Sequence, residues 1–240
     1  MSIPHLILVP GLMCDGTVWT HQARDLATLT TITIADHGSL HSLGKMAEAI
    51  LQRAPARFAI AGHSMGGRVT LEVFRRAPER VAGMILMDTA YTPRREGVSG
   101  DREAEGRHAL LDVARKEGTR AMGAVWVQRM VHPSRLADAA LLDSILDMIG
   151  RKTADIFAAQ IQALLDRPDA TPLLAGIHCP TVVLCGRQDT WAILSQHEKM
   201  SAHIPDSRLV VIEECGHMST MERPAEVTAA MRSWLTSFSV

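Results

Sequence analysis

The sequence lacks the features that direct a chain into a membrane or onto nucleic acid. No apolar run approaches the ~18 residues that a bilayer-spanning helix needs. The first apolar stretch, residues 3–9, follows Met1 and Ser2 without the basic segment and small-residue cleavage site of a secretion signal. The formal net charge is −1, and no long run of Lys and Arg could attract a polyanion. We expect a cytoplasmic protein that neither inserts into membranes nor binds nucleic acid.

Cysteine is also scarce, and no pattern typical of a metal site is present. The four cysteines form no C-x-x-C pair, which argues against a zinc ribbon or a thioredoxin-like redox centre, and we expect reduced thiols at Cys14, Cys179, Cys185 and Cys215. Asp36, His37 and His41 lie close together, but no further ligand follows at a known spacing. We interpret them as a surface cluster. The sequence therefore predicts neither a metal nor a cofactor.

The residues that are present are those of an ordinary globular protein. Hydrophobic residues make up 47% and charged residues 21% of the 240 positions, so a sizeable core is available. One α/β domain with an insertion accounts for this length. Nothing in the composition predicts the oligomeric state.

Short aliphatic runs alternate with amphipathic segments, a pattern typical of a mostly parallel twisted sheet flanked by helices. The expected strands are residues 5–9, 31–35, 57–61, 81–87, 181–185 and 208–213. The expected helices are residues 18–29, 42–53, 65–76, 192–203 and 224–238. Ligands of such sheets bind beyond the carboxyl ends of the strands, so the polar residues that follow each strand are the candidates for a site.

The alternation stops between Tyr91 and about Pro172, where apolar residues recur at helical spacing. We expect an all-helical cap over residues 91–172, inserted after the fourth predicted strand. Residues 1–90 and 173–240 would form the α/β core. Gly and Pro residues within the insertion mark turns between helices and are consistent with a lid that could move.

One motif carries chemistry. Gly62-His63-Ser64-Met65-Gly66 is a G-x-S-x-G pattern between an expected strand and an expected helix. A serine in this pattern occupies a strained turn that exposes its Oγ, and the glycines let neighbouring backbone pass closely. A glycine-rich turn can instead cradle a phosphate, but the lysine of a phosphate loop is absent. The pattern predicts Ser64 as a nucleophile, with the N–H of Met65 able to donate to an oxyanion.

This segment resembles the nucleophile elbow of α/β-hydrolases, in particular the small capped esterases, lactonases and carbon–carbon bond hydrolases. The likeness covers nearly the whole chain apart from the helical insertion. It implies the α/β-hydrolase fold and a triad in the chain order Ser, then Asp or Glu, then His. It is specific for the superfamily and says little about the substrate.

The base and the acid are expected after the last two strands. His217 follows Gly216 beyond the last strand, and Asp189 ends Gly186-Arg-Gln-Asp189 beyond the strand before it; both loops resemble those of the family. We therefore expect His217 as the general base and Asp189 as the acid that orients it. Asp88 stands at the end of the fourth strand and is the alternative acid.

The loop after the first strand resembles the oxyanion loop of the family, with Pro10 where a histidine is usual. The useful group in that loop is a backbone N–H, so the N–H of Leu12 is expected to join that of Met65 in an oxyanion hole. Three apolar residues near these positions are possible lining of a substrate pocket: Met13, Trp19 and Met218.

The leading hypothesis is hydrolysis of an ester or lactone of a small molecule through an acyl-enzyme on Ser64. Two alternatives stay open. One is a carbon–carbon bond hydrolase with the same triad, and the other is a non-catalytic ligand receptor on a hydrolase fold. The resemblance extends to enzymes that cleave carrier-protein or coenzyme esters, which would favour a basic cap. The insertion carries arginines that could form one, together with compensating acids: Arg94, Arg95, Arg102, Arg107, Arg115 and Arg120.

Overall fold

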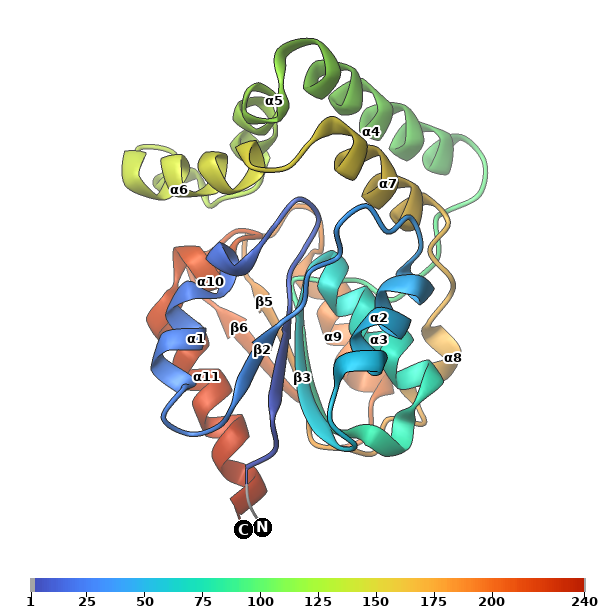
Figure 1. Cartoon of the computed structure of the whole chain (residues 1–240), viewed down its shortest axis with the longest axis vertical. Helices are drawn as coiled ribbons and strands as arrows, with labels where there is room; N and C mark the ends of the chain where they lie inside the picture. The colour runs from blue at the N-terminus through green and yellow to red at the C-terminus, as the bar shows by residue number, and fades with distance from the viewer. Residues whose placement is uncertain (1–2, 240) are drawn as a thin grey trace.

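Six strands form one sheet in which every neighbouring pair is parallel (Figure 1). The computed structural model describes residues 3 to 239. Its strands are β1 (Leu6–Val9), β2 (Ile32–Ile34), β3 (Phe58–His63), β4 (Val81–Met87), β5 (Thr181–Gly186) and β6 (Arg208–Ile212). Their order across the sheet is β2-β1-β3-β4-β5-β6. The predicted parallel sheet is confirmed, and each strand lies within two residues of its expected bounds.

The central strands are apolar because both faces of the sheet are covered. Every residue of β3, β4 and β5 is buried, whereas β2 at the edge is partly exposed. This is why the sequence shows continuous apolar runs rather than an alternation of apolar and polar residues. The core therefore lies along β1, β3, β4 and β5.

Helices cover both faces of the sheet. In Figure 1, α1 and α11 lie on one face, and α2, α3 and α9 lie on the other. The helices packed around the sheet are α1 (Thr20–Leu26), α2 (Leu43–Arg53), α3 (Met65–Arg76), α9 (Leu194–His203), α10 (Ser219–Glu222) and α11 (Pro224–Thr236). Helix α2 shows why they pack: its buried residues recur every three or four positions and form one apolar face.

Three of the predicted helices differ from their expected bounds by two residues or more. The expected helix 18–29 is a 3-10 turn over Gly16–Trp19 followed by α1, and the expected helix 224–238 ends at residue 236. Helix α9 begins at residue 194 rather than 192 because the Oδ1 atom of Asp189 accepts the N–H groups of Trp191 and Ala192. Those two residues are held in a turn instead.

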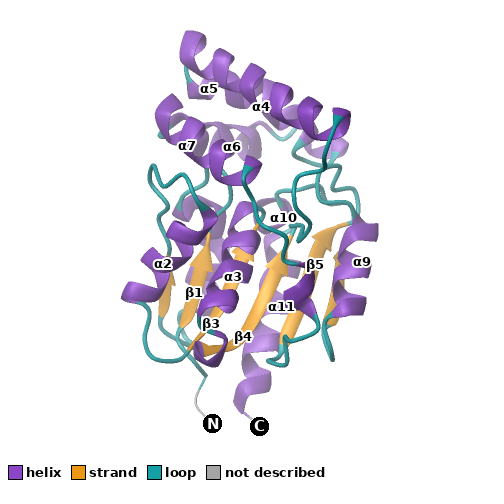
Figure 2. Ribbon diagram, turned by 90° about the vertical axis from the view of Figure 1, so that its right-hand side faces the viewer, coloured by secondary structure: helices purple, strands orange, loops and turns teal. Residues whose placement is uncertain are grey.

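Residues 91–172, all of which the structure describes, contain helices and no strand. The helices are α4 (Val98–Glu117), α5 (Thr119–Trp126), α6 (Ala139–Gly150) and α7 (Ala154–Leu165), and α8 (Thr171–Leu174) follows on the way back to the sheet. Figure 2 shows α4 to α7 above the carboxyl ends of the strands, which the arrowheads mark. Among residues 3–239, no helix combines the length and hydrophobicity that crossing a bilayer demands.

The strand order marks where a ligand would bind. Strand β1 lies between β2 and β3. The chain therefore runs from β1 to β2 on one side of it and then crosses to β3 on the other side, which reverses the strand order. In sheets of this kind the crevice forms at that reversal, outside the carboxyl ends of the strands. Helix α1, which comes after β1, and helix α3, which follows β3, lie on opposite faces of the sheet (Figure 1).

Candidate active site

Ser64 occupies a sharp turn between β3 and α3. Its backbone angles are φ 55° and ψ −119°, a region in which a residue with a side chain is strained. The turn places the residue at the carboxyl end of a central strand, and α3 begins directly behind it. This conformation exposes a side chain that a regular strand-to-helix connection would leave packed.

Two glycines of the motif allow the backbone to come this close. A Cβ atom at Gly62 would lie 2.3 Å from the carbonyl oxygen of Gly66. A Cβ atom at Gly66 would lie 2.1 Å from the carbonyl oxygen of Val9, at the end of β1. Both positions therefore exclude any side chain, which accounts for the G-x-S-x-G spacing.

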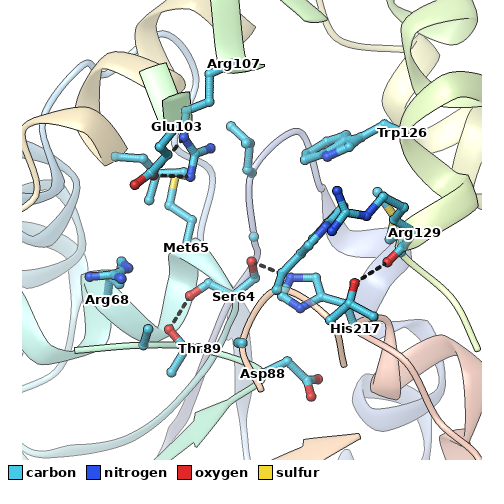
Figure 3. Close-up of a pocket in the computed structure, with 18 of the residues that line it drawn as sticks. Ser64, Met65, Arg68, Asp88, Thr89, Glu103, Arg107, Trp126, Arg129 and His217 are labelled. Carbon is cyan, nitrogen blue, oxygen red and sulfur yellow. Dashed lines mark hydrogen bonds and ion pairs between the residues drawn. The ribbon is translucent and has the colours of Figure 1, made fainter. Parts of the chain in front are cut away.

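The structure brings Ser64, His217 and Asp189 together. The Oγ atom of Ser64 lies 2.8 Å from Nε2 of His217, a contact drawn in Figure 3. The Nδ1 atom of His217 lies 2.6 Å from Oδ2 of Asp189. An imidazole held between a hydroxyl and a carboxylate can take a proton from the hydroxyl while the carboxylate stabilises the resulting cation.

Backbone hydrogen bonds fix the acid and the base. Oδ1 of Asp189 accepts the N–H groups of Trp191 and Ala192 at 2.8 and 3.0 Å, which leaves Oδ2 for the imidazole. The N–H of His217 donates to the carbonyl oxygen of Met130 at 2.8 Å. The loop that carries the base is thus tied to the segment between α5 and α6.

The acid and the base shift each other's titration. Burial lowers the pKa of His217, but the charge of Asp189 and its hydrogen bond outweigh burial and raise that pKa above the ordinary value. Burial raises the pKa of Asp189, and the charge and hydrogen bond of His217 outweigh it and lower that pKa. Each group therefore stabilises the charged form of the other.

Asp88, the alternative acid, does not take this place. Its Oδ1 atom accepts the N–H of Gly186 at 2.9 Å, and its Oδ2 atom accepts the hydroxyl of Ser219. The ring nitrogen 3.6 Å from its carboxylate belongs to His63 rather than to His217. Burial and the charge of Asp189 raise the pKa of Asp88 well above its usual range. The contacts of His217 favour Asp189 as its partner.

The N–H groups of Leu12 and Met65 are available to a ligand. In residues 3–239 neither of them has a protein acceptor, whereas the N–H of Met13 donates to Oε1 of Gln160 at 2.9 Å. The loop after β1 presses on the serine, since a Cβ atom at Gly11 would lie 3.1 Å from the Cβ of Ser64. Two unpaired donors flanking a hydroxyl are what an oxyanion hole requires.

A cavity of about 870 Å³ opens above these groups (Figure 3). Leu12, Met65 and Met218 are among its lining residues. Met13 and Trp19, which were also expected to line the pocket, do not. Both side chains are fully buried in the hydrophobic core, and Trp19 packs edge-on against His63 with ring centroids 6.4 Å apart.

Sequence reasoning missed the aromatic wall of the cavity. Trp126 and Trp191 stack with ring centroids 5.3 Å apart, and Trp191 meets the ring of His217 edge-on at 4.9 Å. Trp191 follows Asp189 closely, which was a usable signal. Trp126 had no signal, because it comes from α5 and the orientation of that helix is not encoded in local spacing.

It also missed three of the arginines that line the cavity: Arg68, Arg129 and Arg167. Arg68 lies four residues after Ser64, one helical turn along α3, a spacing that could have revealed it. Of the arginines that could form a basic cap, three line the cavity: Arg95, Arg102 and Arg107.

Glu222 is a further buried carboxylate that supports the site. It accepts the N–H groups of Gly216 at 3.1 Å, Met218 at 3.0 Å and His132 at 2.7 Å. It therefore holds the loop on either side of His217 and joins that loop to the segment before α6.

The expected surface cluster near residue 37 is dispersed. His37 is buried, with Nε2 3.1 Å from the carbonyl oxygen of Pro10, whereas Asp36 and His41 are exposed. Within residues 3–239, no three His, Cys, Asp or Glu side chains surround a common point as metal ligands do. The four cysteines are unpaired.

Known proteins match almost the whole length of this chain. Residues 6–230 match the model of the Alpha/beta hydrolase family. A curated relative, the pimeloyl-acyl-carrier-protein methyl ester esterase of Nitrosomonas europaea, is 24% identical over 93% of this chain and 92% of its own.

Solved structures agree. A thermophilic esterase from Thermogutta terrifontis, solved with malate bound, has a TM-score of 0.86 and 27% identity, and the match covers 98% of this chain and 90% of that one. An enol-lactonase from Burkholderia xenovorans has a TM-score of 0.84 and 22% identity, with coverage of 98% and 92%. At 22% identity, the similarity to the enol-lactonase shows only that the two proteins share a fold.

The packing at Gly66 predicts that Gly66→Ala destabilises the protein. The added methyl group would collide with backbone of β1, and overpacking of this kind costs about 1–3 kcal/mol. We expect thermal unfolding, followed by circular dichroism, to shift down by about 3–10 °C. Gly106→Ala is the matched control, because a Cβ atom there meets nothing within 4 Å. A Gly66→Ala protein that melts with the wild type would contradict this account of the turn.

Proposed function

Because this chain belongs to the alpha/beta hydrolase family, as its resemblance predicted, we propose that it cleaves a carboxylic ester or lactone of a small molecule through an acyl-enzyme on Ser64. The observation that carries the proposal is the chain of contacts from Ser64 through His217 to Asp189, at 2.8 and 2.6 Å. The unpaired N–H groups beside Ser64 support it.

In the proposed reaction the Oγ of Ser64 attacks the substrate carbonyl carbon while Nε2 of His217 takes the hydroxyl proton. Asp189 stabilises the imidazolium, and the N–H groups of Leu12 and Met65 bind the oxyanion. The carbon–oxygen bond to the leaving alcohol then breaks, and His217 protonates that alcohol. Water, deprotonated by His217, attacks the acyl-enzyme, which releases the acid and restores the hydroxyl of Ser64.

The relatives favour an ester bond over the carbon–carbon bond of the alternative hypothesis. The Nitrosomonas relative is named as a methyl ester esterase, and the Thermogutta structure is that of an esterase. We propose that residues 91–172 act as a cap over a core made of the remainder of the chain. Helices from this segment contribute lining such as Trp126 and Arg107 to the cavity, so the segment would select the substrate by shape and charge.

Ser64→Ala should abolish hydrolysis of p-nitrophenyl butyrate, because the bond to the acyl group forms on the missing oxygen. Its melting temperature should stay close to that of the wild type, since the half-buried hydroxyl has no partner besides His217 among residues 3–239. A fluorophosphonate probe should label the wild type and not the variant. Equal turnover by the two proteins would refute the role of Ser64, and a folded wild type that resists the probe would indicate a binding protein.

Asp189→Asn should lower kcat by a factor of order 10⁴ relative to the wild type. Asp88→Asn should lower kcat far less. An amide at position 189 cannot stabilise the imidazolium, whereas the carboxyl at position 88 is held near its protonated form by burial and an amide resembles it. Steady-state kinetics of the two purified variants on one neutral ester make the comparison. The opposite ranking would move the role of acid to Asp88.

Activity should rise with pH through an apparent pKa above the ordinary 6.5 of histidine. Only neutral His217 can accept the proton of Ser64, and its raised pKa keeps it protonated to a higher pH. The profile of kcat/KM between about pH 5 and 9 checks this. In Asp189→Asn the midpoint should move to lower pH, because the charge that raises it is gone. If the midpoint is the same in Asp189→Asn as in the wild type, the pH profile does not report the titration of His217 beside Asp189.

A further inference from the structure

Three arginines and one glutamate gather on one wall of the cavity, and we term Arg68, Glu103, Arg107 and Arg167 the arginine cluster. All four side chains line the cavity. In Figure 3, Arg68, Glu103 and Arg107 lie on the left of Ser64, and His217 lies on its right. The cluster is assembled from α3, α4 and the segment after α7.

Glu103 is shared by two of the arginines. Arg167 binds it with two parallel hydrogen bonds of 2.7 Å, and Nη2 of Arg107 donates to it at 2.9 Å. Burial alone would raise the pKa of Glu103, but its bonds with Arg167 and the charge of Arg107 lower it to about 2. The glutamate is therefore ionised, and its one negative charge serves two cations.

Arg68 has no acidic partner in the described chain. Its Nη1 atom donates to the carbonyl oxygen of Thr92 at 2.9 Å, which uses one of its five N–H groups. Burial, followed by the charge of Arg167, lowers the pKa of Arg68 to about 9, so it remains a cation at neutral pH. The Nε atom of Arg167 is also buried without an acceptor. The cluster thus holds three positive charges against one negative charge.

We propose that the arginine cluster binds a carboxylate of the substrate, so that the preferred substrates are esters whose acyl chain ends in a carboxylate. Half-esters of dicarboxylic acids belong to this class. A second carboxylate would occupy the free donors of Arg68 and offset the excess charge. The parallel bonds between Arg167 and Glu103 show that carboxylate geometry suits this wall. The inference rests on the proposed function of Ser64.

The proposed mechanism fixes which half of the ester reaches the cluster. His217 protonates the leaving alcohol, so the alcohol side of the ester faces His217. The oxyanion faces the N–H groups of Leu12 and Met65. The acyl chain takes the remaining direction, away from His217, where the cluster lies. The backbone of Arg68 follows that of Ser64 by four residues, a rise of about 6 Å, and we expect an acyl chain of a few methylene groups to reach its side chain.

A matched pair of substrates tests the inference. Mono-p-nitrophenyl adipate and p-nitrophenyl hexanoate share a leaving group and a chain length and differ in a terminal carboxylate. We expect wild-type kcat/KM to favour the adipate half-ester by about 10-fold or more, and Arg68→Gln to reduce that ratio by about 10-fold or more. Arg68→Lys keeps the charge and loses the paired geometry, so it should retain part of the preference.

Two further variants provide a control and a second test of the arginine cluster. Arg115→Gln is the control, because Arg115 is exposed on the same helix as Arg107 and lies outside the cavity lining; its ratio should equal that of the wild type. Arg107→Gln should lower the ratio as Arg68→Gln does, and it supplies the test if Arg68→Gln fails to fold. Thermal melting establishes which variants are folded.

The outcomes separate the two proposals. If both esters are hydrolysed with equal kcat/KM and Arg68→Gln leaves the ratio unchanged, the carboxylate site is refuted and the serine hydrolase stands. If neither ester is hydrolysed, the proposed function fails. Calorimetric binding of adipate then decides the carboxylate site by itself. Binding to wild type and to Ser64→Ala that weakens about 10-fold in Arg68→Gln supports the site, and equal binding by all three overturns it.

Discussion

The site depends on the contact between the end of β1 and the first turn of α3, where no atom fits between Gly66 and the carbonyl oxygen of Val9. This contact brings the loop after β1 against Ser64 and leaves that residue in a strained backbone conformation. It also sets the unpaired N–H groups of Leu12 and Met65 on either side of the serine. A nucleophile and an oxyanion hole that are fixed by backbone packing need no rearrangement when charge develops.

The acid and the base lie on the loops that follow β5 and β6. Three carboxylates are buried near these loops, those of Asp88, Asp189 and Glu222. Their environments keep them in different roles. Asp189 faces the imidazole of His217 and is held ionised by it. Asp88, enclosed with Asp189 nearby, is pushed toward its protonated form, and Glu222 is occupied by backbone N–H groups. Under the proposed mechanism, only one of the three carboxylates can stabilise a positive charge on the base.

The sequence predicted the strands and the meeting of the three loops well, because both follow from local patterns. A parallel strand covered on both faces is apolar at every position, as β4 is, and a turn such as that at Ser64 requires glycines at fixed spacing. The directions in which side chains point were predicted less well. Met13 and Trp19 are close in sequence to the oxyanion loop yet face the core, because a loop residue can turn to either side. Trp126 and Arg167 reach the cavity through the packing of α4 to α7 on one another above the sheet, which no local pattern encodes.

The electrostatics of the cavity differ between its two ends. Near His217 the walls are aromatic, the carboxylate of Asp189 faces the imidazole, and Arg129 also lines the cavity. Near Arg68 the cations outnumber the anions, and Arg95 and Arg102 add positive charge to the lining, so the field would guide an anionic group inward before it meets Arg68. Ser64 directly precedes helix α3, which carries Arg68, so a rigid element sets their separation. The other arginines arrive from residues 91–172. If that segment moves as a cap, α3 would still set the spacing between Ser64 and Arg68, and closure of the cap would bring the other arginines to the bound anion.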